Sequence, residues 1–196
     1  MGAALKEFGE KGYQGASINV MVKHLGISKG SIYQYFKDKE ALFLYVFASS
    51  MDMVKQNLRA IRDQSMDQPL SVRLKLTLGE GVHFIENHPD VYKLYVTLQN
   101  DWSMPMRNEL LQALRTYSLD YIGSFLENAC DRGELRQHTD IAKAGFVIDA
   151  IMDRFLLSRT TPHAAQGTDI FHGDQETVNS WINSIVDMLC QGVIRG

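Results

Sequence analysis

The sequence is poor in cysteine, the residue that forms disulfide bonds and often binds structural metal ions in small domains. Its 196 residues include two cysteines, Cys130 and Cys190, which form no CxxC pair. Two isolated cysteines do not imply a disulfide framework, and a reducing cytoplasm is the compartment that we expect.

Long apolar runs and common catalytic motifs are also missing. No stretch of 18 apolar residues occurs, so we predict no membrane span. The N-terminus has no basic stretch followed by an apolar one, so we expect no signal peptide. HExxH, GxSxG, P-loop and GxGxxG motifs are absent as well. These absences favour a cytoplasmic protein that is not an enzyme and that needs no cofactor.

Positive charge is scarce overall, and its distribution is uneven. The formal net charge is −3, which by itself argues against a nucleic-acid partner. Residues 1–47, however, carry six lysines and four acidic residues, a net charge of +2, whereas the remainder carries a net charge of −5. A basic N-terminal region on an acidic remainder would orient that region toward phosphate.

The stretch from Ser17 to Leu42 has the pattern of two short helices joined by a tight turn. Ser17 is expected to cap the first helix with its side chain, and Gly26 breaks the apolar periodicity as a helix end does. Ser28 is a good N-cap for a second helix, predicted over residues 29–36. Two short helices around a glycine turn, with a polar outer face on the second, predict a helix-turn-helix.

The outer face of the second helix carries donors that suit a DNA groove. Lys29 can donate to a phosphate or to guanine, and Gln34 can bond adenine through both amide atoms. Lys39 gains nothing from the positive N-terminal end of the following helix dipole, so we interpret it as a phosphate ligand. The predicted DNA-binding residues are Ser17, Ser28, Lys29, Gly30, Ser31, Tyr33, Gln34, Tyr35 and Lys39.

Three segments resemble the DNA-binding domain of TetR-family transcriptional regulators. They are Phe8-Gly-Glu-Lys-Gly-Tyr13, Gly26-Ile-Ser-Lys-Gly-Ser-Ile-Tyr-Gln-Tyr-Phe-Lys-Asp-Lys-Glu40 and Leu42-Phe43. The resemblance implies an all-helical homodimer that binds a palindromic operator and is usually released by a small ligand. The chain departs from the family pattern at Glu7, where an apolar residue is usual, and at Val22, where alanine is usual.

Helical periodicity continues through the rest of the chain. It predicts helices over residues 39–61, 70–87, 90–100, 106–132, 140–159 and 175–193, and the polar stretch 160–174 predicts a loop. We therefore predict an all-α fold with two domains. Residues 1–47 form an N-terminal three-helix helix-turn-helix DNA-binding domain, and residues 48–196 form a C-terminal helical ligand-binding and dimerisation domain.

Aromatic residues of the predicted C-terminal domain lie on faces that would converge between helices. Ligand pockets in helical bundles are mostly apolar with a few polar groups, so an apolar or aromatic small molecule is the predicted effector. The same side chains could instead fill the core. The predicted ligand-binding residues are His83, Phe84, Tyr95, Trp102, Tyr117, Tyr121, Phe125 and Met152.

The last two predicted helices combine small residues with an apolar stripe, which permits close packing of helices from two copies. Such a stripe either meets a partner or packs inward. The predicted homodimer interface comprises Phe146, Ala150, Trp181, Ile185, Met188 and Leu189.

These patterns predict a ligand-responsive dimeric regulator, a repressor that a small molecule releases from a palindromic double-stranded DNA operator. An activator remains an alternative. A different hypothesis is a helical ligand-binding or di-metal enzyme with a vestigial helix-turn-helix, because Glu80 and His83 have the Glu-x-x-His spacing of di-iron bundles. Such sites need two pairs and two further glutamates, and we find one pair, so we predict no metal site.

Overall fold

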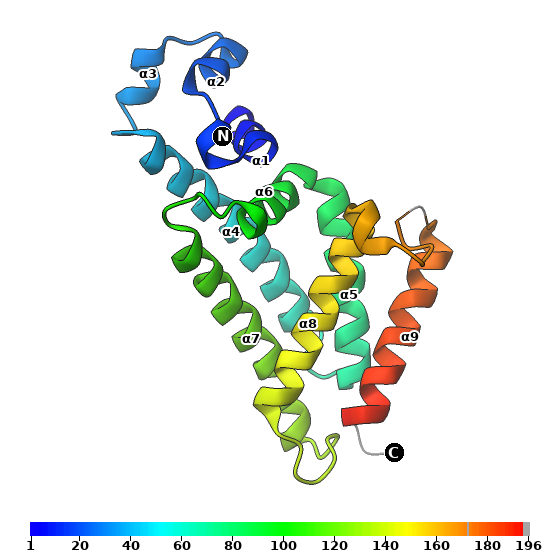
Figure 1. The fold of residues 1–196 in the computed structure, drawn as a ribbon. Coiled ribbons are helices and arrows are strands. Elements are labelled where there is room, and N and C mark those ends of the chain that lie inside the picture. The colour runs from blue at the N-terminus through cyan, green and yellow to red at the C-terminus, as the bar shows by residue number, and fades with distance from the viewer. Residues whose placement is uncertain (172, 194–196) are drawn as a thin grey trace. The chain divides into compact units, whose positions relative to one another are not determined.

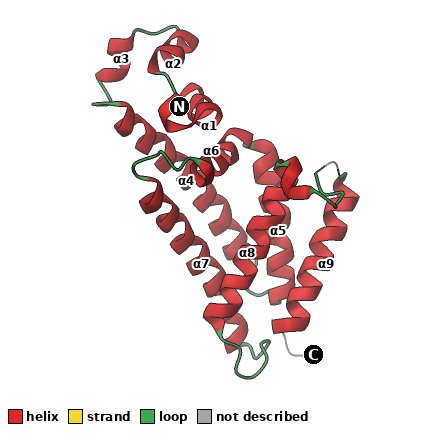
Figure 2. Cartoon of the chain, viewed as in Figure 1, coloured by secondary structure: helices red, strands yellow, loops and turns green. Residues whose placement is uncertain are grey.

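The structure, a computed structural model, consists of helices and their connections (Figures 1 and 2). It describes residues 1–171 and 173–193, and no strand occurs among them, which confirms the all-α prediction. The elements are α1 (Gly2–Gly15), α2 (Ile18–Leu25), α3 (Lys29–Tyr33), α4 (Lys39–Gln64), α5 (Leu70–Asn87), α6 (Pro89–Asn100), α7 (Arg107–Asp131), α8 (Ile141–Thr160), the 3-10 helix η1 (Pro162–Ala165) and α9 (Gln175–Val193).

The helix boundaries follow the sequence periodicity closely in the C-terminal part of the chain. Helices α5 and α9 begin and end at the predicted residues, and α4 extends three residues further, to Gln64. Helix α3 is shorter than predicted, because Gln34 and Tyr35 form turns after Tyr33. None of the described helices is both long enough and apolar enough to cross a membrane.

The chain folds into two compact units. The first contains residues 1–57 and 85–112, and the second contains residues 58–84 together with the described residues from 113 onward. The first unit thus groups α6 with the N-terminal helices. The predicted domain boundary after residue 47 concerns the DNA-binding function and stays a prediction.

Helix α1 packs against α6 within the first unit, and hydrogen bonds join the two helices. The Thr97 hydroxyl donates to the Gly9 carbonyl at 2.8 Å, and the Tyr13 backbone N–H donates to Asp101 Oδ2 at 3.2 Å. A Cβ on Gly9 would lie 3.4 Å from the backbone nitrogen of Leu94. A methyl group at Gly9 would thus make ordinary van der Waals contact with α6.

Gly12 interrupts α1 at the point where it meets Asp101. Its φ of 68° and ψ of 178° lie in a region that is open essentially to glycine alone. After Gly12 the chain resumes one helical turn as far as Gly15. A Cβ on Gly12 would lie 2.9 Å from Asp101 Oδ2, so both the backbone and the neighbouring carboxylate require glycine.

Aromatic rings form the centre of the first unit. Phe8 and Phe43 are fully buried and meet edge to face, with ring centroids 5.0 Å apart. Tyr13 meets Phe43 in the same manner at 5.4 Å. These contacts join α1 to the start of α4, and edge-to-face ring pairs add stabilisation beyond the area that they bury.

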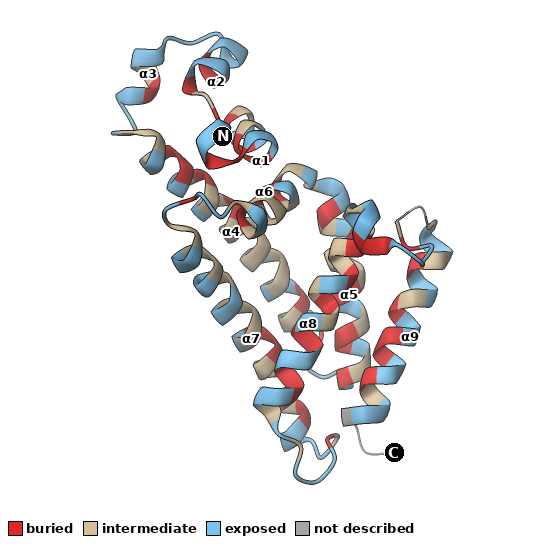
Figure 3. Ribbon diagram, viewed as in Figure 1, coloured by how far each residue is buried: buried red, intermediate tan, exposed pale blue. Residues whose placement is uncertain are grey.

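The second unit has its own apolar core, which α5, α7, α8 and α9 line with buried residues. Figure 3 shows that each of these helices carries buried residues on one side and exposed residues on another. Its most deeply buried members include Leu70, Leu78, Phe125, Leu126, Ile148 and Val186.

Replacing Gly12 with alanine should lower the free energy of unfolding by about 1–3 kcal/mol, because alanine is strained at this φ and ψ. Urea denaturation measures the change. Gly79→Ala is the matched control, since Gly79 is helical and a Cβ there meets no atom within 4 Å. The control should match or exceed wild-type stability by up to about 1 kcal/mol. Equal stability of both variants would contradict the strain assigned to Gly12.

Candidate nucleic-acid interface and ligand-binding region

The turn between α2 and α3 has the geometry that its sequence predicted. Gly26 takes the left-handed conformation, with a φ of 65°, and its N–H donates to the Lys23 carbonyl. The next N–H, of Ile27, donates to the Val22 carbonyl at 3.2 Å, so both bonds of a Schellman motif are present. Ser28 Oγ then accepts the Ser31 backbone N–H at 3.2 Å and caps α3.

The hydrogen bonds at the N-terminus of α2 differ from those that the sequence predicted. Ser17 is its N-cap residue, but the Ser17 side chain makes no capping hydrogen bond, so the predicted side-chain cap is wrong. Instead, Glu7 Oε1 accepts the Ser17 backbone N–H at 3.1 Å. This contact explains why an acidic residue occupies a position of α1 where an apolar residue is usual. A carboxylate is also favourable at the positive end of α2.

Most of the predicted DNA-binding side chains lie on the exposed surface of α3 and the turns beside it. Tyr35 is 83% exposed, and Ser28, Lys29, Gly30, Tyr33 and Gln34 are exposed as well. The Lys29 ammonium lies 5.9 Å from the centre of the Tyr33 ring. Ser31 is partly buried and bonds Ser28 through its hydroxyl at 2.9 Å. Their contact with DNA stays a prediction.

Lys39 has partners inside the chain. Its ammonium donates to the carbonyl oxygens of Gln14 and Ala16 at 3.2 and 3.4 Å, and it lies 4.8 Å from the centre of the Tyr13 ring. The sequence analysis explained this lysine at the start of α4 by a phosphate; the two carbonyl oxygens give it partners within the chain, and its contact with phosphate stays a prediction. Lys39 is favourable because it caps the carbonyl end of α1, where the helix dipole is negative.

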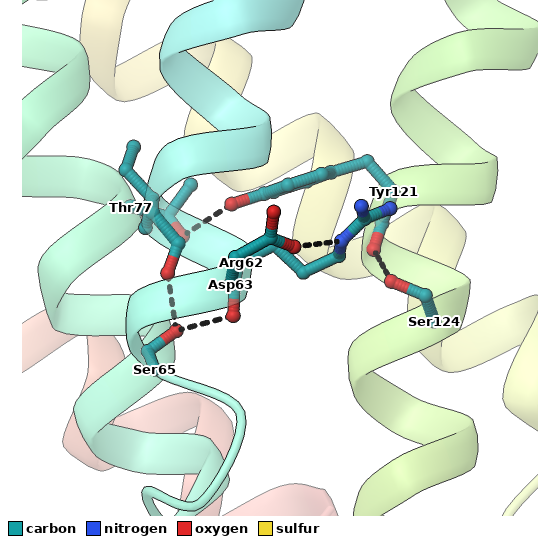
Figure 4. A network of polar contacts seen from close by, with 7 residues as sticks. Arg62, Asp63, Ser65, Thr77, Tyr121 and Ser124 are labelled. Carbon is teal, nitrogen blue, oxygen red and sulfur yellow. Dashed lines mark hydrogen bonds and ion pairs between the residues drawn. The ribbon is translucent and has the colours of Figure 1, made fainter.

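Three of the predicted ligand-binding residues lie in the core of the second unit. Tyr121, Phe125 and Met152 are buried there. Figure 4 shows Tyr121 reaching from α7 toward Thr77 of α5, and the two hydroxyl oxygens lie 3.3 Å apart. Thr77 donates its own proton to the Arg73 carbonyl, so Tyr121 is the donor to Thr77. Burial raises the pKa of Tyr121 to about 12.

The other predicted ligand-binding residues are more accessible or belong to the first unit. Phe84 and Tyr117 are half-buried and His83 is exposed, whereas Tyr95 lies in the first unit. Trp102 is 82% exposed, and the Arg107 guanidinium lies 4.1 Å from the centre of its ring. The prediction that Trp102 converges with the others between helices is therefore wrong. Trp102 follows α6 in a bend at the surface, where a cation covers one face of the ring.

The second unit contains two buried charged residues, Asp149 and Arg73, which are not in the predicted lists of site residues. Asp149 of α8 accepts hydrogen bonds from Arg115 and Ser118 of α7. Arg73 of α5 is 1% exposed and lies over the Phe125 ring. The signal for Arg73 was present in the sequence, because it shares the inward face of α5 with Leu70, Leu74 and Thr77. A charge at an inward helical position is unusual and needs a specific partner.

The predicted dimer residues divide into two groups. Phe146 and Met188 are 58% and 63% exposed, and Ala150 is exposed as well. Ile185 and Leu189 are buried in the core of their own unit, so the prediction that they face a partner is wrong. They lie on the inward side of α9, whereas Met188 lies on its outer side. Trp181 is half-buried and its indole N–H donates to Asp169 at 2.6 Å.

The described residues contain no group of three or more histidine, cysteine, aspartate or glutamate side chains that could hold a metal ion. Glu80 and His83 therefore belong to no such group in the described part of the chain.

Replacing Lys39 with methionine should lower the free energy of unfolding by about 1–2 kcal/mol, because two carbonyl oxygens lose a charged donor. Lys37→Met is the matched control, since Lys37 is exposed two residues earlier. The control should change stability by less than about 0.5 kcal/mol. Chemical denaturation that finds the two variants equally stable would refute the capping role.

The N-terminal helices of this chain match a known family of proteins. A family model described as "Bacterial regulatory proteins, tetR family" matches residues 1–46. The HTH-type transcriptional regulator SAR2658 of Staphylococcus aureus (strain MRSA252) is 38% identical over 142 residues, which cover 60% of this chain and 77% of that protein. The HTH-type transcriptional regulator YerO of Bacillus subtilis (strain 168) is 24% identical over 197 residues, covering 98% of this chain, and the chain spans 63% of YerO.

Solved structures share the whole fold. The transcriptional regulator FadR from Bacillus subtilis, in complex with stearoyl-CoA, superposes with a TM-score of 0.74 at 18% identity, covering 97% of this chain and 96% of that chain. At that identity the likeness shows the fold alone. The identity to SAR2658 and the match of the N-terminal helices to the family model together show that this chain belongs to the TetR family of transcriptional regulators.

Proposed function

We propose that the chain is a dimeric repressor in the cytoplasm that binds a palindromic operator and is released by a small apolar molecule. The observation that carries the proposal is the geometry around Gly26. Its left-handed turn and the Ser28 cap orient α3 as a recognition helix whose polar face is exposed. Helix-turn-helix proteins place this second helix in the major groove.

In this proposal the recognition surface divides into base-reading and phosphate-binding residues. Lys29 and Gln34 are exposed and have the donors that read guanine and adenine in the major groove. Tyr35, the most exposed of the tyrosines beside α3, supplies a hydroxyl for the phosphate backbone. The DNA-binding region, residues 1–47, carries a net charge of only +2. Two copies of this region on one dimer are therefore needed for useful affinity.

The proposed dimer forms through the exposed apolar residues of α8 and α9. Phe146 and Val147 on α8 and Met188 on α9 are large apolar side chains that the monomer leaves in water. Pairing of the same two helices from two copies would form a four-helix bundle and bury them. The two recognition helices would then reach half-sites about 34–36 Å apart or somewhat more.

The proposed ligand binds in the second unit and acts on the first through the helices that the two units share. Helix α4 runs without interruption from Lys39, beside the helix-turn-helix, to Gln64 in the second unit. A ligand that favours one arrangement of these helices lowers operator affinity, and operator and ligand are then coupled reciprocally by about 1–3 kcal/mol. The stearoyl-CoA complex of FadR supports an effector with an apolar chain.

Random-site DNA selection with the purified protein, at two salt concentrations, tests the proposal. A dimeric operator reader should enrich a palindromic sequence and lose affinity steeply as salt rises. A protein that enriches no sequence, or that enriches a site without two-fold symmetry, contradicts it. Metal analysis of the same preparation tests the rival hypothesis of a di-metal enzyme, which requires bound iron.

Lys29→Ala should weaken binding to the selected operator by about 1–3 kcal/mol and relax base preference at one position of each half-site. Lys75→Ala is the matched control, because it removes the same charge from α5 in the second unit, outside the two helices of the proposed dimer interface. Fluorescence anisotropy with a labelled operator measures both. An equal loss in the two variants would show that Lys29 contributes net charge and no specific contact.

Met188→Glu should convert the dimer to monomers and abolish operator binding at concentrations where the wild type binds, because it places a charge in the proposed interface. Met66→Glu, at another exposed methionine, controls for the added charge and should leave the dimer intact. Sedimentation equilibrium measures the association. A dimer that persists in Met188→Glu would place the interface elsewhere.

A further inference from the structure

Arg73 is a fully buried cation in the apolar core of the second unit. It is 1% exposed and lies on α5 between Leu70 and Leu74, which are buried as deeply. Its guanidinium carbon lies 3.8 Å from the centre of the Phe125 ring. Arginine keeps its proton in proteins, so this position carries a full positive charge in an apolar environment.

The contacts of the guanidinium are incomplete. Nη1 donates to Asn128 Oδ1 at 2.9 Å. Nε is buried and, within the described part of the chain, reaches no acceptor. Buried donors without a partner are rare in folded proteins because each costs free energy, and an unmatched charge adds to that cost.

Glu134 is the carboxylate that acts on Arg73 electrostatically, and it is already engaged by other groups, as is Asp63 beside Arg62. Asp63 pairs with Arg62 at 3.1 Å, and Glu134 pairs with Arg132 at 2.9 Å while it also accepts the Leu70 backbone N–H. Arg62 and Arg132 also act on Arg73 electrostatically, and Glu134 is bound to Arg132, so the positive charge of Arg73 stays unmatched. In the described chain no carboxylate lies within ion-pair distance of it.

Tyr121 does not neutralise this charge either. Its hydroxyl proton is donated to Thr77, and burial raises the pKa of Tyr121 to about 12, so the phenol stays neutral at physiological pH. Burial also lowers the pKa of Arg73, which is the direction expected for a cation that lacks a counter-ion. Tyr121 instead contributes an apolar ring and a neutral oxygen beside the guanidinium.

We propose that Arg73 binds the carboxylate of a monoanionic effector whose remaining surface is apolar. The proposal rests on the proposed function, because it names the chemical class of the ligand in the second unit. Nε and the adjoining Nη2 form the edge of a guanidinium that binds a carboxylate in bidentate fashion. One unmatched positive charge fits a single negative charge better than a phosphate dianion. The Phe125 ring against the guanidinium and the buried ring of Tyr121 make the surroundings of Arg73 apolar.

A residue-specific test uses the wild-type protein labelled with 15N. The Nε–Hε resonance of Arg73 is assigned by its loss in Arg73→Lys. Octanoate, hexadecanoate and benzoate are the probes, and octanamide and benzamide are their neutral counterparts. At least one carboxylate should shift the Nε resonance with saturation, whereas the amides should not. If no carboxylate of the series shifts it, or if an amide shifts it as strongly, the proposal is wrong.

A second test separates ligand binding from a structural role of Arg73. Arg73→Met should reduce affinity for the active carboxylate by at least about tenfold, while the thermal midpoint of the unliganded protein stays equal or rises, because a buried unmatched cation is replaced by an apolar side chain. Arg62→Met is the control, since Arg62 is partly exposed and ion-paired. It should retain carboxylate affinity. A lower midpoint for Arg73→Met together with unchanged carboxylate affinity would assign Arg73 a purely structural role and overturn the proposal.

Operator binding distinguishes failure of this proposal from failure of the proposed function. Arg73→Met should bind the selected operator as the wild type does, and the carboxylate that releases the wild type should no longer release the variant. Release of both proteins at the same carboxylate concentration would overturn the proposal and leave the regulator intact. A protein that selects no operator would contradict the proposed function, and the Nε resonance would still report whether Arg73 binds a carboxylate.

Discussion

The packing of α1 against α6 is the contact on which the first unit depends. Gly12 leaves room for the Asp101 carboxylate, and Thr97 and Asp101 supply hydrogen bonds across the contact. Once α1 is in place, its aromatic residues meet the start of α4, and its carbonyl end is available to Lys39. The helix-turn-helix thus depends on contacts with α6, a helix that lies far from it in the sequence.

The division of the chain into units suggests how the helix-turn-helix can respond to a ligand. The chain passes between the units after residues 57, 84 and 112, and each of these points lies inside a helix, α4, α5 or α7. In our proposal the ligand biases these helices. Arg73 on α5 and Tyr121 on α7 sit in two of them, so a carboxylate bound there would act directly on segments that continue into the first unit.

Local rules predicted the helices and the turn, whereas long-range contacts were beyond them. The periodicity from Leu70 to Asn87 and the Gly26–Ser28 turn depend on neighbours within a few residues, and both were predicted correctly. The partners of Glu7 and Lys39 depend on segments 10 to 25 residues away, so composition alone did not reveal them. The apolar stripe on α9 was predicted to form one dimer surface. In the fold, Ile185 and Leu189 lie in the core, whereas Met188 is exposed to solvent. Arg73 was visible as a charge at an inward position, yet its missing counter-ion could be recognised only in the structure.

Hydrogen–deuterium exchange tests most directly whether α6 supports the helix-turn-helix. The comparison is between Asp101→Ala, which removes the acceptor of the Tyr13 N–H, and Ser103→Ala, which removes only a local partner of Asp101. Asp101→Ala should exchange faster throughout α1, α2 and α3, including residues that do not contact Asp101, whereas Ser103→Ala should exchange as the wild type does. Unchanged protection of α2 and α3 in Asp101→Ala would show that the helix-turn-helix is stable without this contact. That result would contradict the claim that α6 supports it.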